Sequence, residues 1–281
     1  MSIKFFPKIS IVTPSFNQAE FIEETILSVL NQKYPNLEYI IIDGGSSDGT
    51  IDIIKKYEDK IAYWISEKDD GQSYAINKGL QRSTGEIISW LNSDDIFSNN
   101  ALYTIASAFK KFQSPLIVGG SLHWDAVNHL KVPHESNPKT FRDLLRYHEG
   151  IYLPQPSVFY SQKLLCKAGY LNNSLHFTMD LDLWLKFGLI EGENQKITYI
   201  PELISLMRSH SGQKTFKNNF EAMKEVSTVV LKYSKKYRLN WRERLILFFQ
   251  NRLFRYNMSL HNNDRFRFLD IILYSKLKKI F

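Results

Sequence analysis

Residues 39–50, with the sequence YIIIDGGSSDGT, decide the fold of this 281-residue chain. The run Tyr39–Asp43, apolar up to its last residue, predicts a strand that is covered on both faces, because half-exposed strands alternate apolar and polar residues. The glycine-rich polar segment after it predicts a loop, and the residues from Thr50 to about Glu58 predict a helix. A strand, a loop and a helix in this order are typical of an open sheet with parallel strands.

The same pattern recurs on both sides of this stretch. Further β-branched runs predict strands at Ile9–Thr13, Ile61–Ile65 and Ile87–Leu91. Apolar residues recur at helical spacing over residues 22–30, and a second amphipathic segment covers about Gln72–Arg82. Strands that alternate with helices predict an α/β fold, with an open, mixed and mostly parallel sheet flanked by helices.

Beyond Asn99 the pattern is less regular. Helices are expected at Ala101–Phe112 and Met179–Leu189, and strands at Pro115–Gly120, Ser157–Tyr160 and Ile197–Leu206. From about Phe216 the sequence predicts helices that carry many aromatic and basic side chains. We therefore expect an α/β domain over residues 1–215 and a basic, aromatic C-terminal helical extension over residues 216–281.

Composition is that of an ordinary globular protein, with 43% hydrophobic and 23% charged residues. The single cysteine, Cys166, excludes an intramolecular disulfide, and no apolar run approaches the roughly 20 residues that span a bilayer. The net charge of +7 is concentrated in residues 232–281, which hold thirteen Lys and Arg against three Asp and Glu. We expect a cytoplasmic protein whose basic segment either packs on the rest of the chain or lies on the anionic inner face of the cell membrane.

Polar residues follow three of the first four predicted strands, at Thr13–Asn17, Asp43–Thr50 and Asn92–Asp95. Ligands of an open parallel sheet bind beyond the carboxyl ends of its strands, so these segments are candidates for a ligand site. A carboxylate at Asp43 can accept an N–H of a uracil or guanine base, and Gly44 and Gly45 leave room for the backbone to approach that base. The segment is neither a dinucleotide fingerprint nor a P-loop, so a phosphate would need another counter-charge.

Adjacent carboxylates supply that counter-charge through a metal ion. Asp94 and Asp95 repel each other unless a cation bridges them, and Mg²⁺ or Mn²⁺ would do so and would also neutralise a diphosphate. Such a pair alone usually caps the next helix, but its position after an apolar strand favours a metal site. Asp180 and Asp182 are two residues apart and cannot share one helix face, so one of them is available as a general base.

Together these motifs resemble the inverting glycosyltransferases of family 2, which have the GT-A fold and are found in bacterial surface-polysaccharide synthesis. The resemblance covers roughly residues 8–215, and it implies that the domain expected over residues 1–215 is a GT-A domain that binds a nucleotide sugar and carries catalysis. It rests on the segments 13–17, 42–50, 70–79, 84–88, 92–95 and 180–185, and on Arg208-Ser209-His210.

The resemblance implies roles for individual residues. Asp43 corresponds to the acid that contacts the base, and Asp180 corresponds to the catalytic base. Asn92-Ser93-Asp94-Asp95 takes the place of the family's DxD motif, with Asp94 and Asp95 as metal ligands. His210 corresponds to the histidine of an Arg-x-His motif that reaches the metal or a phosphate, unless it is an ordinary loop histidine. The other residues implied in binding the nucleotide sugar, beside Asp43 and Asp94, are Thr13, Pro14, Phe16, Asn17, Asn77, Lys78, Asn92 and Ser93.

Two positions depart from the family pattern. Asn92 replaces the first acid of the DxD motif, so it can hydrogen-bond a ribose or sugar hydroxyl but is a weaker metal ligand. Met179 replaces the Glu that precedes the catalytic acid.

The resemblance implies a single in-line displacement, in which Asp180 takes a proton from an acceptor hydroxyl and the oxygen attacks the anomeric carbon. Mn²⁺ or Mg²⁺ would stabilise the charge on the departing nucleoside diphosphate. The implied donor is a UDP-, dTDP- or GDP-sugar, and the implied acceptor is a glycan or a lipid-linked glycan.

Three other functions remain open. A sugar-1-phosphate nucleotidyltransferase would need a basic, glycine-rich loop after the first strand, where Thr13–Asn17 holds no base. A nucleic-acid binder would explain the positive charge, but that charge is confined to the C-terminal segment and no recognition motif is evident. We therefore expect no specific nucleic-acid partner. The third alternative is a scaffolding relative of the glycosyltransferases that has lost catalysis.

Overall fold

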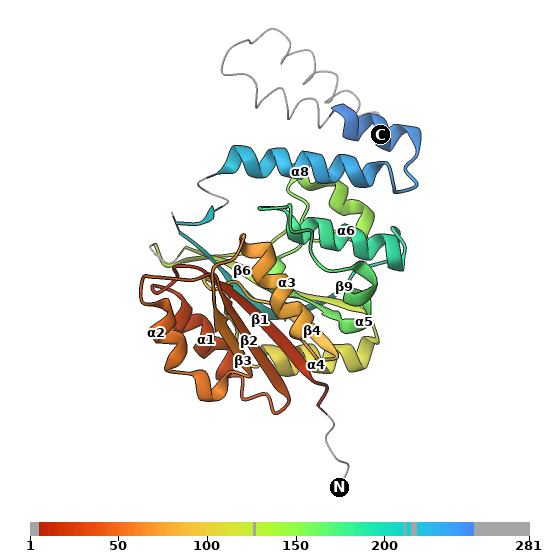
Figure 1. Ribbon diagram of the computed structural model, residues 1–281. Coiled ribbons are helices and arrows are strands. Elements are labelled where there is room, and N and C mark those ends of the chain that lie inside the picture. Colours follow the sequence, from red (N-terminus) through yellow and green to blue (C-terminus); the bar gives the residue numbers. More distant parts are fainter. Residues whose placement is uncertain (1–5, 126–127, 211, 215–217, 250–281) are drawn as a thin grey trace. The chain divides into compact units, whose positions relative to one another are not determined.

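The computed structural model describes residues 6–125, 128–210, 212–214 and 218–249 (Figure 1). The chain forms two compact units, each assembled from several segments. The sheet unit contains residues 1–135, 153–176 and 197–211, and the helical unit contains residues 136–152, 177–196 and 212–281. The boundary expected after residue 215 follows the end of the sequence motifs. That expected boundary divides the chain differently from the two compact units, and it stays a prediction.

The sheet unit is built on a mixed sheet that has nine strands over the described residues. The strands are β1 (Ile9–Ser15), β2 (Leu37–Asp43), β3 (Tyr63–Ser66), β4 (Ile87–Trp90), β5 (Ile96–Phe97), β6 (Leu116–Asp125), β7 (Leu130–Pro133), β8 (Val158–Ser161) and β9 (Thr198–Ser209). Their order is β3-β2-β1-β4-β8-β6-β9-β5, with β7 paired to β6. The pairs among β3, β2, β1 and β4 are parallel, as is β6 with β9, whereas β8, β7 and β5 pair antiparallel. The expected open, mixed sheet is therefore confirmed.

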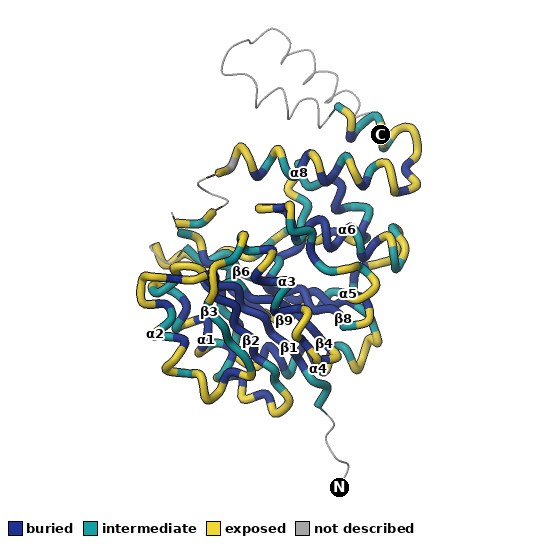
Figure 2. The backbone as a smooth tube through the Cα atoms, viewed as in Figure 1, coloured by how far each residue is buried: buried dark blue, intermediate teal, exposed yellow. Residues whose placement is uncertain are grey.

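Helices cover both faces of this sheet. They are α1 (Ile22–Leu30), α2 (Thr50–Lys55), α3 (Gln72–Arg82), α4 (Ala101–Phe112) and α5 (Gln162–Ala168), with short 3-10 helices η1 (Glu58–Lys60) and η3 (Gln155–Ser157). Ile11 and Ile41 belong to the apolar core that β1 and β2 share with α1, α2 and α4. On the opposite face α3 packs closely on β1. The approach is so close that a Cβ on Gly79 would lie only 2.3 Å from Val12 Cγ1. As a result β1 is buried along its whole length (Figure 2).

The carboxyl ends of β1, β2, β3 and β4 lie at one edge of the sheet, because these strands run parallel. The direction of β9 is the same, since β8 pairs antiparallel with both β4 and β6, and β6 pairs parallel with β9. The predicted ligand segments therefore reach one edge of the sheet unit from five strands.

The helical unit contains α6 (Met179–Glu191), α8 (Asn219–Ser234) and the 3-10 helix η2 (Phe141–Glu149), and the segment 241–249 is also helical. Most of α6 is buried, and the hydroxyl of Tyr237 donates to the Leu185 carbonyl at 2.9 Å. The expected C-terminal helices are confirmed as far as residue 249, and the same expectation for residues 250–281 lies outside the described residues. Within the described ranges, we find no helix with the length and apolar character that crossing a bilayer requires.

Candidate active site

Two loops meet beyond the carboxyl ends of β1 and β2. Asn17 adopts a left-handed conformation with a φ of 51°, and its N–H donates to Ser46 Oγ at 2.7 Å. Its Oδ1 accepts the N–H of Ser47 at 2.9 Å, while the N–H of Gly44 donates to the Ser15 carbonyl at 2.8 Å. These bonds join the loop after β1 to the loop after β2, so the structure brings two of the predicted ligand segments together.

Asp43 is fully buried and holds the second loop in place. Its Oδ2 accepts the N–H groups of Gly45 and Ser46 at 3.1 and 2.9 Å. The Ser66 hydroxyl also donates to Oδ2, at 2.6 Å, and the Ser46 hydroxyl donates to Oδ1 at 2.5 Å. Four donors occupy most of the acceptor capacity of a carboxylate. The role of Asp43 within the protein is thus to shape the loop, and its contact with a base stays a prediction.

Asp69 is a second carboxylate at this edge, and it is absent from the residues predicted above. A Cβ on Gly44 would lie 2.9 Å from Asp69 Oδ2, so a glycine at position 44 permits the carboxylate to approach. Burial raises the pKa of Asp69; the N–H of Gly71 opposes this rise, and the charges of Asp43 and Asp70 add to it. The acidic pair Asp69-Asp70 in the segment between the third strand and the next helix was the available sequence signal.

Three of the four predicted binding residues in the segment 13–17, namely Thr13, Pro14 and Phe16, differ in exposure. Phe16 is 59% exposed, so its ring is accessible for stacking on a planar base. Thr13 and Pro14 are buried, and Thr13 Oγ1 lies 3.2 Å from the Tyr39 hydroxyl. Phe16 is therefore the most accessible of the three, and nucleotide contacts by Thr13 and Pro14 stay predictions.

Asn77 and Lys78 lie on α3, and both contact other parts of the sheet unit. Asn77 Nδ2 donates to the Leu171 carbonyl at 3.0 Å and to Asn173 Oδ1 at 2.5 Å. Its Oδ1 accepts the N–H of Leu171 at 2.9 Å, so the side chain fixes the segment after α5 on α3. Lys78 forms an ion pair with Glu67. The predicted donor contacts of Asn77 and Lys78 stay predictions beside these structural contacts.

The loop after β4 brings a predicted metal ligand to the end of β9. Asp94 Oδ2 lies 3.0 Å from His210 Nε2, although the residues are 116 positions apart in the sequence. The imidazole packs on the Phe21 ring, with the centroids 4.4 Å apart. The Thr25 hydroxyl lies 2.9 and 2.7 Å from the carbonyls of Ser93 and Asp95, and thereby holds the loop against α1.

Asp95 is buried and bonded within the protein. Its Oδ1 accepts the N–H of Arg208 at 3.0 Å, and its Oδ2 accepts Asn92 Nδ2 at 3.3 Å. Burial and the neighbouring charge of Asp94 raise the pKa of Asp95 well above its usual value, although its bonds with Arg208 and Asn92 oppose the rise. Asn92 also accepts a hydrogen bond from Gln72 Nε2 at 3.0 Å. Asp94 is thus the more available metal ligand of the two acids.

Arg208 supports the Asp94 loop from β9. Its Nε donates to the Asp94 carbonyl at 2.9 Å, and its Nη2 forms an ion pair with Glu24 on α1. The guanidinium carbon lies 4.3 Å from the centroid of the Trp124 ring and 5.1 Å from that of Phe21. A planar guanidinium held in this way fixes the main chain that presents Asp94. The Arg-x-His motif indicated His210 but gave no sign of this role for Arg208.

The pair Asp94 and His210 fits part of a divalent metal site. Their separation of 3.0 Å matches neighbouring ligands on an octahedral ion with bonds of about 2.1 Å. Carboxylate oxygen and neutral imidazole are both ligands of first-row divalent metals such as Mn²⁺. In the part of the chain that the structure describes, no group of three or more His, Cys, Asp or Glu side chains could hold a metal ion. Water and phosphate oxygens would therefore complete the coordination.

The predicted catalytic base, Asp180, belongs to the helical unit and lies in the first turn of α6. It is partly exposed, and its Oδ1 accepts the N–H of Leu181 at 2.7 Å. Burial raises the pKa of Asp180 to about 6; backbone N–H groups oppose this rise, and the charge of Glu225 adds to it.

Asp182, by contrast, is fully buried. It is bonded to Lys232 Nζ at 2.8 Å and to the Tyr233 hydroxyl at 3.0 Å. Of these two aspartates, only Asp180 is accessible to a substrate.

The sequence as a whole also matches a known family. A family model described as glycosyl transferase family 2 covers residues 10–167, which is more than half of the chain. The chain belongs to glycosyl transferase family 2. This membership confirms the family resemblance, and it favours a glycosyltransferase over a nucleotidyltransferase or a nucleic-acid binder.

Curated relatives of this family-2 glycosyltransferase carry matching names. An uncharacterised glycosyltransferase of Rickettsia typhi is 28% identical over 222 residues, which cover 75% of this chain and 67% of that protein. The putative teichuronic acid biosynthesis glycosyltransferase TuaG of Bacillus subtilis is 40% identical over 99 residues, or 34% of this chain and 39% of TuaG.

Solved structures confirm the GT-A fold. S. aureus TarS 1–349 in complex with UDP-GlcNAc superposes with a TM-score of 0.64 at 20% identity, covering 91% of this chain and 74% of that one. The mannosyltransferase PcManGT from Pyrobaculum calidifontis, in complex with GDP-Man and Mn²⁺, gives a TM-score of 0.55 at 18% identity and covers 83% of this chain and 64% of PcManGT. At these identities the likeness extends to the fold alone.

Proposed function

We propose that this family-2 glycosyltransferase moves a sugar from a nucleoside diphosphate sugar to a hydroxyl of a glycan or lipid-linked glycan, with inversion at the anomeric carbon. The observation that carries the proposal is the approach of Asp94 to His210, 3.0 Å apart, at the sheet edge where the Asn17 and Asp43 loops also lie. A potential diphosphate counter-charge and a potential base pocket thereby share one edge of one sheet.

In this proposal the base stacks on Phe16, and Asp69 shares base recognition with Asp43. Asp69 suits the role because its carboxylate lies against Gly44, whereas Asp43 is occupied by four hydrogen-bond donors. A carboxylate acceptor matches the imide N–H of uracil or thymine and an N–H of guanine. The complexes of TarS with UDP-GlcNAc and of PcManGT with GDP-Man support a nucleoside diphosphate sugar as the donor.

Asp94 and His210 would hold Mn²⁺ or Mg²⁺, with Asp95 behind them as a support for the loop. When bound, the ion acts as a Lewis acid that stabilises negative charge on the departing diphosphate. Arg208 keeps the Asp94 main chain in place, so little reorganisation is needed when charge develops. The complex of PcManGT with Mn²⁺ supports a divalent ion in this fold.

We assign the role of general base to Asp180 from its sequence motif and its own surroundings. With a pKa of about 6 it is ionised at neutral pH, and it is still basic enough to accept a proton from an attacking hydroxyl. The hydroxyl oxygen then bonds to the anomeric carbon from the face opposite the diphosphate, the glycosidic bond to the diphosphate breaks, and the configuration inverts.

The test is a panel of UDP-, dTDP-, GDP- and CMP-sugars, each with Mn²⁺, Mg²⁺ or EDTA, scored by calorimetric binding and by slow donor hydrolysis. We expect metal-dependent turnover of one nucleotide class, lowered on the order of 100-fold in Asp94→Ala. Asp52→Ala, which removes an exposed carboxylate on α2, is the matched control and should behave as the wild type. If no donor binds with either metal, the chain is a scaffolding relative and the proposal fails.

A further inference from the structure

The last described helix, residues 241–249, contacts the helical unit through the side that carries Glu243 and Leu247. Arg142 Nη1 donates to Glu243 Oε1 at 3.0 Å, and its Nη2 donates to the Arg238 carbonyl at 3.0 Å. Leu239 and Leu247 are 7% and 5% exposed. Glu243 and Leu247, four residues apart, therefore mark the inner side of this helix.

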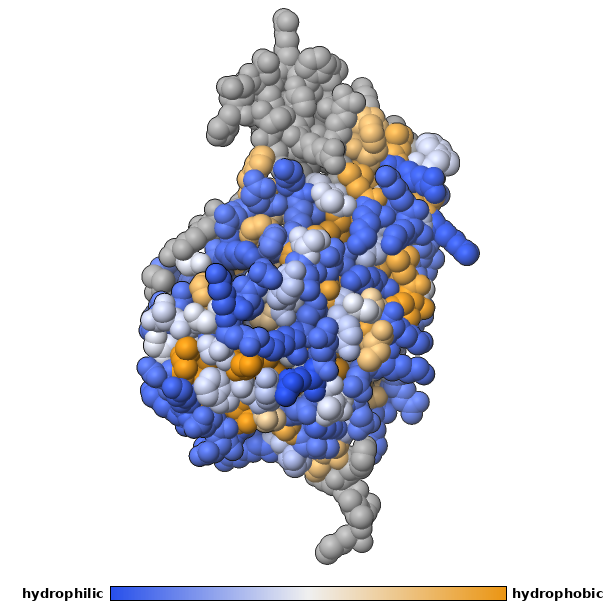
Figure 3. Space-filling model, in the orientation of Figure 1, coloured by the Kyte–Doolittle hydropathy of each residue, from blue (hydrophilic) through white to orange (hydrophobic). Residues whose placement is uncertain are grey.

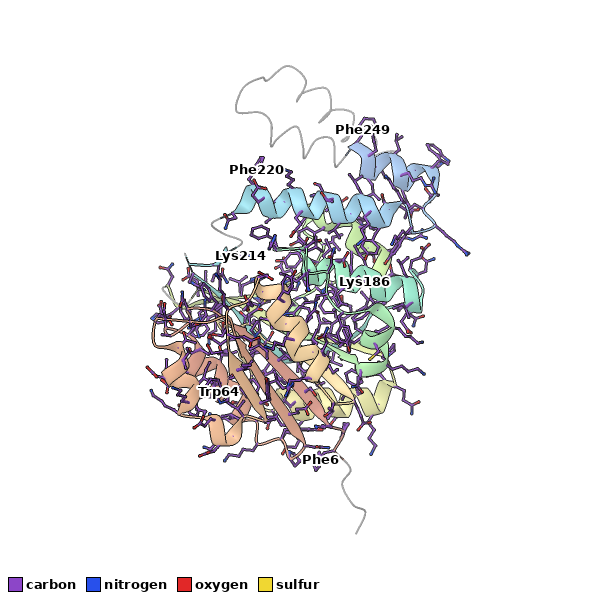
Figure 4. The ribbon with its side chains drawn as sticks, in the orientation of Figure 1. Phe6, Trp64, Lys186, Lys214, Phe220 and Phe249 are labelled. Carbon is purple, nitrogen blue, oxygen red and sulfur yellow. The ribbon has the colours of Figure 1, made fainter. Side chains whose placement is uncertain are left out.

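The opposite side of this helix carries large apolar side chains. At about 100° per residue, Trp241, Leu245 and Phe248 point away from the side that holds Glu243 and Leu247. Trp241 is 65% exposed and Phe248 is 54% exposed. Hydrophobic residues gather over this end of the described chain in Figure 3, and Phe249 extends from the same helix in Figure 4. The exposed fraction of Trp241 is unusually large for a tryptophan, because large aromatic side chains are normally mostly buried.

Cations flank this apolar side. Arg242 and Arg244 are exposed and lie on its two flanks, and Arg242 lies over the Trp241 ring at 5.3 Å. Lys235, Lys236 and Arg238, just before the helix, are exposed as well. Glu243 is the only acidic residue between positions 235 and 249, and it is bonded to Arg142 on the inner side. Among residues 235–249, the outward side therefore combines apolar and positive groups and contains no acidic residue.

We propose that this outward face, formed by Trp241, Arg242, Arg244, Leu245 and Phe248, docks on a membrane surface that contains anionic lipid. A helix with aromatic residues on one side and arginine on the flanks lies in the plane of the headgroups, where the rings enter the acyl boundary and the cations meet phosphates. A second copy of the chain is a poorer partner, because pairing this face with itself would oppose arginine to arginine. The inference is independent of the proposed sugar transfer.

The test is flotation of the full-length protein with vesicles of phosphatidylcholine alone or mixed with phosphatidylglycerol. We expect the wild type to float with the anionic vesicles at low salt and to be released as salt rises. The double variant Trp241→Ser/Phe248→Ser should bind these vesicles more weakly, by at least about tenfold. Phe112→Ser/Leu130→Ser is the matched control, because these side chains are 44% and 58% exposed in the sheet unit. It should float as the wild type does.

A second measurement locates the contact. Brominated lipid should quench the Trp241 emission of vesicle-bound protein, and this component should be missing in Trp241→Phe, which should still float. Arg242→Gln/Arg244→Gln should reduce flotation and flatten its salt dependence. The proposal is overturned if Trp241→Ser/Phe248→Ser floats like the wild type, or if Trp241 is not quenched. A concentration-dependent dimer that the same double variant abolishes would instead assign the face to a second copy.

Discussion

At the residue scale, Asp180 connects burial with a dependence on pH. Its pKa of about 6, raised mainly by burial, means that the carboxylate needed as a base is lost below that pH. We expect kcat/KM to fall about tenfold per pH unit below 6, and Asp180→Asn to lower activity on the order of 100-fold or more and to remove this limb. A pH profile of donor turnover with acceptor present checks both. An unchanged acidic limb in Asp180→Asn would assign it to another group.

Asp180 and Asp182 of α6 should affect stability in opposite directions. The pKa of Asp180 is raised in the folded protein, so its contribution to stability is present below its unfolded pKa and is lost as pH rises through about 6. Burial alone would raise the pKa of Asp182, but Lys232 and Lys186 hold it below its usual value, so its contribution is present at neutral pH and is lost in acid.

We therefore expect Asp180→Asn to raise the melting temperature at pH 8 relative to the wild type, with a smaller difference at pH 5. Asp182→Asn, the matched variant on the same helix, should lower the melting temperature at pH 8. Thermal melts of the three proteins at both pH values decide the matter, and a loss of stability at pH 8 in Asp180→Asn would contradict the assignment.

Arg208 gives a prediction about positioning. Arg208→Met removes the donor to the Asp94 carbonyl and the partner of Glu24, while leaving Asp94 and His210 in the chain. We expect about 1–3 kcal/mol lower stability. Mn²⁺ binding measured by calorimetry should weaken by about 10–100-fold, as expected for a group that orients a ligand. Arg82→Met is the control, since Arg82 also stacks on a ring, that of Tyr63 at 3.7 Å, but is exposed on α3. Equal Mn²⁺ affinities in the two variants would exclude the positioning role.

The sequence identified residue types at the sheet edge better than the directions of their side chains. A carboxylate at the end of a buried strand was predictable, but the bond from Ser66 to Asp43 depends on the neighbouring strand β3. The meeting of Asp94 and His210 was indicated by two separate motifs, and their distance depends on how β9 joins the sheet.

At the element scale, α3 illustrates how close packing fixes a helix on the sheet. A Cβ on Gly79 would lie 2.3 Å from Val12 Cγ1, closer than any real contact. We expect Gly79→Ala to lower the free energy of unfolding by about 1–3 kcal/mol. Val12→Ala makes room, so the double variant should lose less than the sum of the single variants in urea unfolding. Strict additivity would mean that α3 shifts and the contact is not limiting.

Sequence patterns predicted the long helices and several short strands, and missed other short elements, among them β5 and α5. The expected helices Gln72–Arg82 and Ala101–Phe112 agree with α3 and α4 at both ends, because apolar spacing is clear over three turns. The strand β5 has two residues and pairs with β9, so no local pattern could reveal it. The helix α5 was missed although Ser161 caps it and Gly169 ends it, which are signals that the sequence does contain.

At the scale of the whole molecule, two units share one chain that passes between them several times. Residues 136–152 and 177–196 belong with the C-terminal helices, an assignment that requires long-range contacts and that composition does not reveal. The division has a functional consequence, because the proposed donor contacts lie in the sheet unit whereas Asp180 lies in the helical unit. Donor binding should therefore protect segments of the sheet unit, and a method that measures each segment of the chain separately should detect this.

Hydrogen exchange with mass spectrometry provides that resolution. When donor and Mn²⁺ are present at a hundredfold excess over Kd, binding stabilises the bound state by about 2.7 kcal/mol. Amides that exchange only when the binding site unfolds should therefore exchange about 100-fold more slowly. We expect this protection at residues 13–19, 43–50 and 92–95, because hydrogen bonds join the first two loops and Asp94 lies in the third. Peptides from α8 should change little, and Asp94→Ala should lose the protection at residues 92–95. Protection confined to α6 and α8 would place the donor in the helical unit and would refute the site described above.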